Sequence, residues 1–423
     1  MRKLFTLLAL MLALSLAVAA CTTATEEPSL EGETVTIFTA AGEEQAVAFQ
    51  SEFEAFTAET GIEVVVEGSP DFEQLTVVRC EAGDAPDIMN FPQPGLMADL
   101  ARDDCLVDLG FMDMGFLESN YSDAWIESGK VDGTLYGIWH NADVKSLVWY
   151  PKEDFEARGF EIPQTWDELL ALTADIASSG ETPWCIGIES GGATGWAATD
   201  WIEDIMLRTT SVENYDKWTT GELPFSSPEV KNAFEIAGQI FFNPDYVVGG
   251  TTGILTTNFG DSPLGLFEPR TCFLHRQASF IPNFFPEGTE VGVDVDYFYL
   301  PPIDDAYGKP VLGSGSLLSV GQDRPAVRKV MEFLATPASV ENEVREGLFV
   351  APQSGVPLDW YPSSALQGFA EILANADTFR FDGSDLMPGD VGAGSFWTGV
   401  TDWIGGADLD EVLAKIDASW PSD

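Results

Sequence analysis

The sequence predicts an α/β protein of two lobes, and three observations lead to this fold class. Strand-like and helix-like segments alternate along the chain from residue 34 onward. The first three form a βαβ unit, for which a right-handed connection and a parallel sheet are expected. A second α/β region and several helices follow, which fits two α/β lobes whose chain crosses between them. The length of 423 residues, of which 45% are hydrophobic, suits two or three domain-sized units or one large one.

The βαβ unit occupies the start of the predicted first lobe. Residues 34–39 alternate β-branched and apolar side chains, as strands do. Residues 43–60 are predicted to form one helix, which ends at Gly61, a common helix C-cap residue. Its apolar side chains recur at spacings of three and four, at Ala46, Phe49, Phe53 and Phe56. The second strand is expected at 62–67, and an apolar, β-rich segment spans 136–150.

The predicted second region begins with a capped helix. Thr165 is expected to be the N-cap and Glu168 its partner in a capping box. Strands are expected at 184–188 and 293–300, a Gly- and Ser-rich apolar segment at 311–320, and helices at 227–242, 325–334, 369–376 and 409–419. In such folds ligands bind in the crevice at the carboxyl ends of the strands.

The N-terminus predicts export. Two basic residues precede an apolar run at 4–18, which is shorter than a membrane span and typical of a signal peptide. The run ends in Val-Ala-Ala-Cys21, which resembles a bacterial lipobox; a plain secretory signal with a chance Cys is the alternative. We therefore expect a lipoprotein signal peptide at 1–20, a lipidated Cys21 and a flexible tether at 21–33.

Four further cysteines, at positions 80, 105, 185 and 272, are expected to form disulfides in an exported chain. Four cysteines allow three connectivities, and we favour the sequence-local one, Cys80–Cys105 with Cys185–Cys272. Zinc is a poor alternative because the chain has no Cys-x-x-Cys and only two histidines. No metal or cofactor is expected.

The formal net charge of −49, from 20 basic and 69 acidic side chains, restricts the partners. It argues against nucleic acid and against a polybasic membrane surface, because both need clustered cations. It favours a neutral or cationic ligand. Most of these charges are expected to form a solvated surface.

Motifs of catalysis are missing. The sequence has no Gly-x-Ser-x-Gly, no Walker loop and no Gly-x-Gly-x-x-Gly. The segment 382–385 (Asp-Gly-Ser-Asp) resembles part of a calcium loop, but a surface turn is the expected structure because the remaining ligands are absent. Carboxylate pairs suited to a glycosidase arise by chance among 69 acids. The sequence therefore predicts a binding protein and not an enzyme.

Aromatic residues provide the evidence for a sugar ligand. Several of the 12 tryptophans, including Trp196, Trp201, Trp397 and Trp403, lie in Gly-rich or polar stretches. A sugar presents apolar C–H faces to an aromatic ring and hydroxyls to polar side chains. Packing in the core is the alternative for any one tryptophan.

Several segments of residues 34–423 resemble the extracellular solute-binding proteins of bacterial ABC importers, in the carbohydrate group that includes maltose-binding proteins. The similar segments are 42–44 with 60–62, Gly-Asp-Ala-Pro-Asp-Ile at 83–88, the first hinge crossing at 136–150, 309–315, and Ser-Phe-Trp at 395–397. Two longer stretches, 182–191 and 272–280, are similar to α-glucoside-binding proteins. Both Cys185 and Cys272 would then lie in the second lobe, which supports their pairing. The acidity and the Trp139-His140 pair depart from the family pattern.

The resemblance implies a maltose-binding-protein-like fold with hinge crossings and a central ligand cleft. Lobe 1 would comprise 34–140 and about 301–335, and lobe 2 about 141–300 and 336–423. The implied ligand residues are Glu43, Glu44, Phe91, Gln93, Asn141, Trp196, Asp200, Trp201, Arg276, Ser314, Phe396 and Trp397. Of these, Trp397 is the expected stacking platform, Arg276 either bridges hydroxyls or holds an internal ion pair, and Ser314 either donates a hydroxyl or lets the backbone bend.

The implied function is capture of an α-glucoside or related di- or oligosaccharide by hinge closure. The closed form would deliver the sugar to a membrane permease, with ATP hydrolysed by separate subunits, and the chain would act as a monomer on the outer face of the cytoplasmic membrane or in the periplasm. Two other functions stay open: a binding protein of the same fold for another solute, such as a peptide, a metal or a polyamine that suits the acidity, and a secreted glycosidase.

Overall fold

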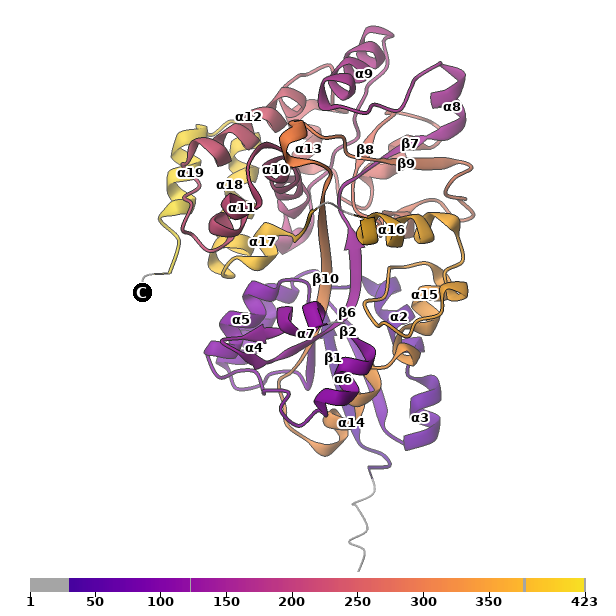
Figure 1. The fold of residues 1–423 in the computed structure, drawn as a ribbon, viewed down its shortest axis with the longest axis vertical. Helices are drawn as coiled ribbons and strands as arrows, with labels where there is room; N and C mark the ends of the chain where they lie inside the picture. The colour runs from indigo at the N-terminus through magenta and orange to yellow at the C-terminus, as the bar shows by residue number, and fades with distance from the viewer. Residues whose placement is uncertain (1–29, 122, 376–377, 422–423) are drawn as a thin grey trace, which may run out of the picture.

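The computed structural model describes residues 30–121, 123–375 and 378–421, which form two lobes joined by long strands (Figure 1). The predicted signal peptide, Cys21 and most of the predicted tether lie outside the described residues. None of the helices in the described part is both long and apolar enough to cross a membrane.

The first lobe is built on a mixed sheet with the strand order β11-β10-β3-β1-β2, to which β6 adds by pairing with β10. Strands β2 and β3 flank β1 in parallel, as the predicted βαβ unit requires, and β10 runs antiparallel to β3 and β6. The strands are β1 (Thr34–Thr39), β2 (Glu63–Gly68), β3 (Ile88–Phe91), β6 (Gly137–Val144), β10 (Pro310–Val320) and β11 (Thr378–Phe381).

Helices of the first lobe cover this sheet, and one of them differs from its prediction. The helix expected at 43–60 is two helices, because at Glu52 and Phe53 the backbone N–H groups bond to the carbonyl three residues back and tighten the turn. Its four predicted apolar positions are nevertheless all buried. The helices are α2 (Glu43–Ser51), α3 (Glu54–Thr60), α4 (Phe72–Glu81), α5 (Pro94–Arg102), α6 (Met114–Asn120), α7 (Asp123–Ser128) and α14 (Pro325–Leu334), with a hairpin of β4 (Lys130–Val131) and β5 (Thr134–Leu135).

The second lobe has an antiparallel sheet in the order β8-β7-β9, formed by β7 (Leu147–Pro151), β8 (His275–Arg276) and β9 (Val295–Tyr299). The strand predicted at 184–188 is instead a buried segment with single bridges from Trp184 to Val247 and Leu274. The helices are α8 (Lys152–Ala157), α9 (Trp166–Ser178), α10 (Trp196–Thr209), α11 (Val212–Thr219), α12 (Pro228–Phe241), α13 (Gly250–Thr256), α16 (Ser364–Asn375), α17 (Gly383–Leu386), α18 (Trp397–Ile404) and α19 (Leu409–Asp417). Helix α15 (Glu341–Glu346) packs against α2 of the first lobe, where the Glu343 N–H donates to Glu52 at 2.6 Å.

Local signals explain where several of these helices begin. The Thr165 hydroxyl accepts the Glu168 N–H at 3.3 Å and caps α9 as predicted, although the Glu168 carboxylate binds the N–H of Gln164 and not that of Thr165. Ser227 caps α12, which has Pro228 in its first turn. Such caps satisfy N–H groups that have no partner within the helix.

The lobes have separate cores, and two strands pass between them. Along the β6–β7 crossing, Trp139 belongs to the first-lobe core, Val144 to a smaller core beside the hinge, and Val148 to the second-lobe core. Strand β10 likewise contributes Leu317 to the first core and Leu312 to the second. Figure 1 shows β6 and β10 running side by side from one lobe toward the other. The residue boundaries predicted for the lobes stay a prediction.

Both predicted disulfides are present. Cys80 at the end of α4 is bonded to Cys105 after α5, and Cys185 is bonded to Cys272 in the second lobe. Each bond joins segments that are already neighbours in the fold, and the pairs are 25 and 87 residues apart in sequence.

Candidate functional site

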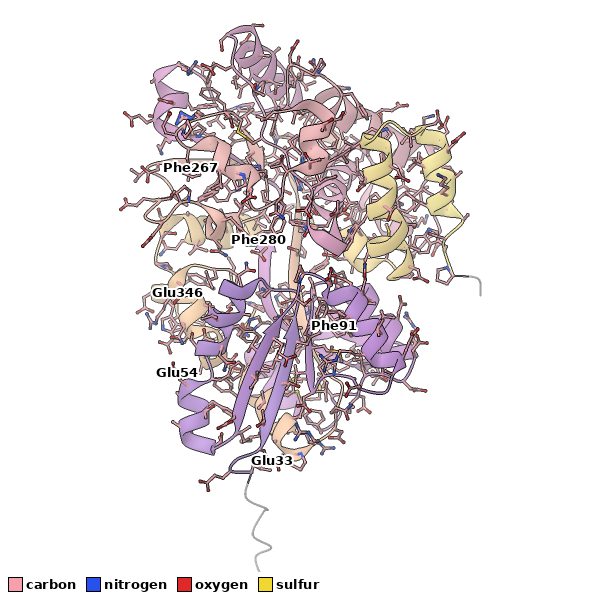
Figure 2. All side chains as sticks on the ribbon, turned by 180° about the vertical axis from the view of Figure 1, so that it is seen from behind. Glu33, Glu54, Phe91, Phe267, Phe280 and Glu346 are labelled. Atoms are coloured by element: carbon pink, nitrogen blue, oxygen red, sulfur yellow. A yellow bond between two sulfur atoms is a disulfide. The ribbon has the colours of Figure 1, made fainter. Side chains whose placement is uncertain are left out.

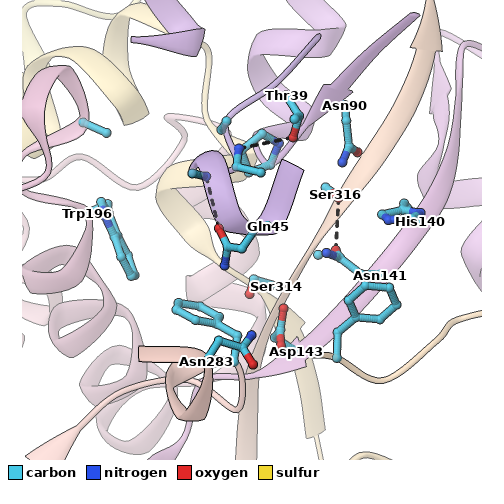
Figure 3. Close-up of a pocket in the computed structure, with 18 of the residues that line it drawn as sticks. Thr39, Gln45, Asn90, His140, Asn141, Asp143, Trp196, Asn283, Ser314 and Ser316 are labelled. Carbon is cyan, nitrogen blue, oxygen red and sulfur yellow. Dashed lines mark hydrogen bonds between the residues drawn. The ribbon is translucent and has the colours of Figure 1, made fainter. Parts of the chain in front are cut away.

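A cavity of about 410 Å³ lies between the lobes, beside the crossing strands. This volume is in the range of small-molecule sites. The first lobe lines the cavity through the ends of its strands and the first turn of α2, β6 and β10 form its floor, and the second lobe closes it with aromatic side chains (Figure 3). Figure 2 shows Phe280, one of the lining residues, at the boundary between the lobes.

Strand ends place polar groups at the first-lobe wall. Thr39 ends β1 and Asn90 lies near the end of β3, so the parallel sheet directs both toward its carboxyl edge. Gln45, in the first turn of α2, accepts the N–H of Gly42 at 3.2 Å (Figure 3). Gln93 follows β3 and donates to Glu73 at 3.0 Å.

Three buried polar atoms at this wall and floor have no hydrogen-bond partner among the described residues. They are Asn90 Oδ1, Gln93 Oε1 and His140 Nδ1. A buried polar atom without a partner costs about 1–3 kcal/mol. The cavity therefore favours a ligand that brings hydrogen-bonding groups to these atoms, and the two amide oxygens need donors.

Two tryptophans from the second lobe face this polar wall. Trp196 begins α10, and its ring meets Phe259 edge-on with centroids 5.0 Å apart. Trp397 begins α18 and donates from Nε1 to the Ser384 hydroxyl at 3.3 Å. Gly195 brings the two helix starts together, because its φ is 121° and an added Cβ would overlap the Trp397 carbonyl oxygen. A π-helical turn, Asp390–Phe396, leads into α18, and such turns occur frequently at functional sites.

The floor carries polar side chains from the crossing strands. The Ser316 hydroxyl donates to Asn141 Oδ1 at 3.1 Å, and Ser314 lies two residues along β10 (Figure 3). Asp143 accepts from the Ser279 hydroxyl at 3.0 Å. Burial raises the pKa of Asp143 to about 7, although the Ser279 bond and the Lys145 charge oppose this shift. His140 Nε2 lies 3.2 Å from Glu343 Oε2.

A buried ion network borders the cavity and is centred on Lys145, the residue directly after β6. Its ammonium donates to Asp200 at 2.9 Å and to Asp382, and it lies 5.2 Å from the centre of the Trp196 ring. Burial alone would lower the pKa of Lys145, but the two carboxylates raise it well above its usual value. Burial raises the pKa of Asp200 to about 6, against the lowering effect of Lys145 and Arg276.

Arg276 belongs to this network and not to the cavity wall. It donates to Asp200 at 3.1 Å and to Asp204 at 2.9 Å, and all three side chains are buried. Of the two predicted roles of Arg276, the structure has the internal ion pair.

The Asp-Gly-Ser-Asp segment at 382–385 is buried, so the predicted surface turn is wrong. Asp382 caps α17 by accepting the Asp385 N–H at 3.0 Å, and Glu203 accepts the N–H groups of Gly383 and Ser384 at 3.0 and 3.1 Å. Asp200, Glu203 and Asp382 have carboxylate oxygens within 4.8 Å of one another. Lys145 supplies the counter-charge, which gives the segment a structural role in holding the second lobe to the hinge.

The predicted ligand residues divide into those at the cavity and those in the core. Five line the cavity: Gln93, Asn141, Trp196, Ser314 and Trp397. Five others are buried away from it, namely Phe91, Asp200, Trp201, Arg276 and Phe396. Glu43 and Glu44 begin α2, but their side chains lie outside what the structure describes. Contact of the five cavity residues with a ligand stays a prediction.

The misplaced aromatic predictions have a common physical reason. Phe91 packs edge-on against Phe72, Trp201 against Trp184, and Phe396 against Phe225. Phe91 and Phe396 are next to the cavity residues Asn90 and Trp397 and point away from the cavity, because neighbours diverge by half a turn in a strand and by about 100° in a helix. Trp201 lies five residues after Trp196, which places it about 140° away from Trp196 around α10.

Sequence reasoning missed several cavity residues. Thr39 has a detectable signal, since it ends the strand predicted at 34–39. No local signal marks the others, which the fold brings together from α2, α17, loops and the hinge: Gln45, His140, Asp143, Phe259, Phe280, Asn283 and Asp385.

Comparison with known proteins matches this chain to one protein family and to several relatives. A family model described as bacterial extracellular solute-binding protein matches residues 40–341. The chain is 47% identical over 404 residues to the alpha-glucosides-binding periplasmic protein AglE of Rhizobium meliloti, covering 93% of this chain and 88% of that protein. It is 46% identical over 380 residues to the osmoprotective compounds-binding protein GgtB of Synechocystis, covering 89% and 90%.

Solved structures share the fold at low identity. The bacterial solute receptor AcbH superposes with a TM-score of 0.78 at 18% identity, covering 92% of this chain and 97% of that one. The maltose-bound MalE3 of T. maritima superposes with a TM-score of 0.71 at 17% identity, covering 91% and 98%. These likenesses establish the two-lobed fold that the sequence predicts.

Proposed function

This chain belongs to the bacterial extracellular solute-binding protein family, and from that premise we propose that it captures an α-glucoside or a related di- or oligosaccharide for an ABC importer. The observation that carries the proposal is the cavity between the lobes, in which two tryptophans face buried amide oxygens without partners.

Each wall of the cavity suits one side of a sugar. The rings of Trp196 and Trp397 offer apolar surface to the C–H face of a pyranose ring. Asn90 and Gln93 offer acceptors to hydroxyl donors, and such hydrogen bonds recover the cost of the buried unpaired oxygens. The name of the relative AglE supports α-glucosides as the sugar class.

A cationic solute such as a polyamine is the second candidate, because four carboxyl residues line the cavity: Glu73, Asp143, Glu343 and Asp385. Burial raises the pKa of Glu73, of Asp143 and of Asp385, which favours their neutral forms. Lys145 adds a positive charge to the same cavity. A neutral ligand therefore suits the cavity better than a cation does.

The proposed mechanism is binding with hinge closure. The solute bridges the two lobes and shifts the population toward the closed form, while β6 and β10 act as the hinge. The closed monomer then docks on a membrane permease whose separate subunits hydrolyse ATP. We propose no catalytic activity for this chain.

The same proposal places the protein outside the cytoplasm. Residues 1–20 would be removed as a signal peptide, and lipidation of Cys21 would anchor the chain on the outer face of the cytoplasmic membrane. Mass spectrometry of the protein purified from membranes would detect a diacylated or triacylated Cys21 as the first residue, and an unmodified Cys21 would contradict the anchor.

Titration calorimetry with trehalose, maltose, sucrose and spermidine tests the solute class. The proposal predicts saturable 1:1 binding of at least one of the three sugars and no comparable binding of spermidine. Binding of spermidine without a response to any α-glucoside would overturn it.

A further inference from the structure

The two lobes touch in this structure along one side of the cavity. Gly192 of the second lobe lies against the start of α4, where an added Cβ would be 3.2 Å from both Asp71 and Gln74. The N–H of Gly389 donates to Asp99 of α5 at 2.7 Å. At Gly95, in the first turn of α5, an added Cβ would overlap the carbonyl oxygen of Met387. In this structure the second lobe therefore packs against α4 and α5.

Closure brings carboxyl groups of the two lobes toward each other. Glu73 of α4 and Asp385 of α17 line the same cavity from opposite lobes. Beside them, Asp99 of α5 faces Asp390 of the π-helical turn. Separating the lobes would increase the distance between the partners of each pair and expose these groups further to water.

The charged groups around Glu73 and Asp385 affect how easily the two lobes bring these carboxyl groups together. Asp71 is the nearby charge on the first-lobe side of Glu73, and the Gly191–Ala193 turn that packs on α4 adds none. Asp385 has Asp382 on its own side and Asp200 from α10 nearby, with Lys145 from the hinge as the nearby cation. Acidic groups outnumber cationic ones at this contact.

The pKa values of Glu73, Asp385 and Asp99 are all raised. Burial raises the pKa of Glu73, with Asp71 adding to the shift and the Gln93 bond opposing it. Burial also raises the pKa of Asp385 well above its usual range, and repulsion from Asp382, Asp200 and Glu73 adds to this while Lys145 opposes it. Burial raises the pKa of Asp99 too, against its bond from Gly389 and the charge of Arg102.

We propose that the lobes close with uptake of protons at Glu73 and Asp385, so that capture of the solute strengthens as the pH falls. The solute-binding half of this inference rests on the proposed function, whereas the closure half does not. A group whose pKa is higher in the closed form stabilises that form. The full stabilisation is present at pH values below the open-form pKa, and it is lost as the pH rises through the closed-form pKa. Uptake of one proton strengthens affinity by at most about tenfold per pH unit.

Small-angle X-ray scattering of the ligand-free protein between pH 5 and pH 8 tests the closure. We expect the radius of gyration to fall as the pH falls. In the double variant Glu73→Gln/Asp385→Asn, which mimics the protonated groups, the protein should stay compact over the whole range. The matched control Glu59→Gln/Asp175→Asn removes two exposed carboxylates, one from each lobe, and should follow the wild type.

A radius of gyration that does not change with pH, or one that changes equally in wild type and in Glu73→Gln/Asp385→Asn, would overturn the proposal. Circular dichroism of each variant confirms that it is folded. If any sugar of the panel binds, calorimetry at pH 6.5 in phosphate and in Tris measures the protons taken up with it, and we expect uptake in the wild type that is reduced in the variant. If no sugar binds, the proposed function fails, yet the scattering still decides the closure.

Discussion

Trp397 and Trp196 combine structural and binding roles at the level of single residues. Trp397 is only 3% exposed and Trp196 is half-buried, and both rings reach the cavity from the first turn of a helix. Trp196 therefore presents an apolar ring surface in this form, and packing holds both rings so that they lose little side-chain entropy when a ligand binds. Aromatic side chains in this situation dominate binding energies.

Trp397→Ala is expected to weaken sugar binding at least about 30-fold, which corresponds to about 2 kcal/mol. Quenching of the remaining tryptophan fluorescence during a sugar titration measures the change. The control is Trp360→Ala, which removes a half-buried tryptophan that does not line the cavity. Affinities of the two variants that agree within twofold would reject Trp397 as a sugar platform.

Lys145 is expected to contribute to the stability of the folded protein. Its ammonium neutralises Asp200 and Asp382 in a buried site, so Lys145→Met leaves both carboxylates without that partner. Breaking such a pair costs about 3–5 kcal/mol. Urea unfolding followed by far-UV circular dichroism should show this loss.

The matched control for Lys145 is Lys217→Met, which breaks an exposed pair with Glu213 at 2.6 Å. Exposed pairs of this kind contribute about 0–1 kcal/mol. Equal losses in the two variants would show that the network around Lys145 does not hold the second lobe together.

Individual helices and strands position these residues, and only some of these elements can be predicted from the sequence. The alternation at 34–39 and the capping signals at Thr165 and Ser227 are local, and the elements that they predict are present. The burial of Asp382 and Asp385 depends on Lys145 and Glu203 from distant segments, which no local pattern reveals. For the same reason the cavity residues at strand ends are predictable, while Phe259, Phe280 and Asn283 are not.

The junction of α10 and α18 depends on Gly195. In Gly195→Ala the new Cβ would overlap the Trp397 carbonyl oxygen, and the φ of 121° is strained for any residue with a side chain. We expect this variant to displace the start of α18, to lower the affinity for the sugar and to lower the unfolding midpoint. Gly180→Ala, at a positive φ with open space around it, is the control for backbone strain alone. A Gly195→Ala variant with wild-type affinity would contradict the role of this junction.

The two disulfides should differ in their effects on stability. Chain-entropy arguments give about 3–4 kcal/mol for the 25-residue separation of Cys80–Cys105 and about 4–5 kcal/mol for the 87-residue separation of Cys185–Cys272. Guanidinium unfolding of the two Cys→Ser double variants measures both values. Free thiols found at these positions by peptide mapping of the wild type would contradict the pairing.

At the scale of the whole molecule, separate cores in the two lobes, joined by crossing strands, make a hinge possible. Strand β10 contributes to both cores, so rotation of the lobes requires small backbone changes near Leu312 to Leu317 and near Lys145. The bulge in the β6–β10 register at Ser316 and Leu317 lies in this region. Bulges bend strands locally, which suits a hinge.

Ligand closure is therefore expected to make the protein more compact as a whole. Addition of a saturating α-glucoside should lower the radius of gyration in solution at pH 8, where the ligand-free lobes are most open under the proton-linked account. Scattering with and without sugar measures this. An unchanged radius of gyration alongside calorimetric binding would mean that the solute binds without closure.

A crystal structure of the protein grown with the α-glucoside that binds best in calorimetry would locate the solute. We expect the sugar in the cavity between the lobes, with a ring face on Trp196 or Trp397 and hydroxyls bonded to Asn90 Oδ1 and Gln93 Oε1. An empty cavity at saturating sugar, or a sugar bound elsewhere on the surface, would contradict this expectation.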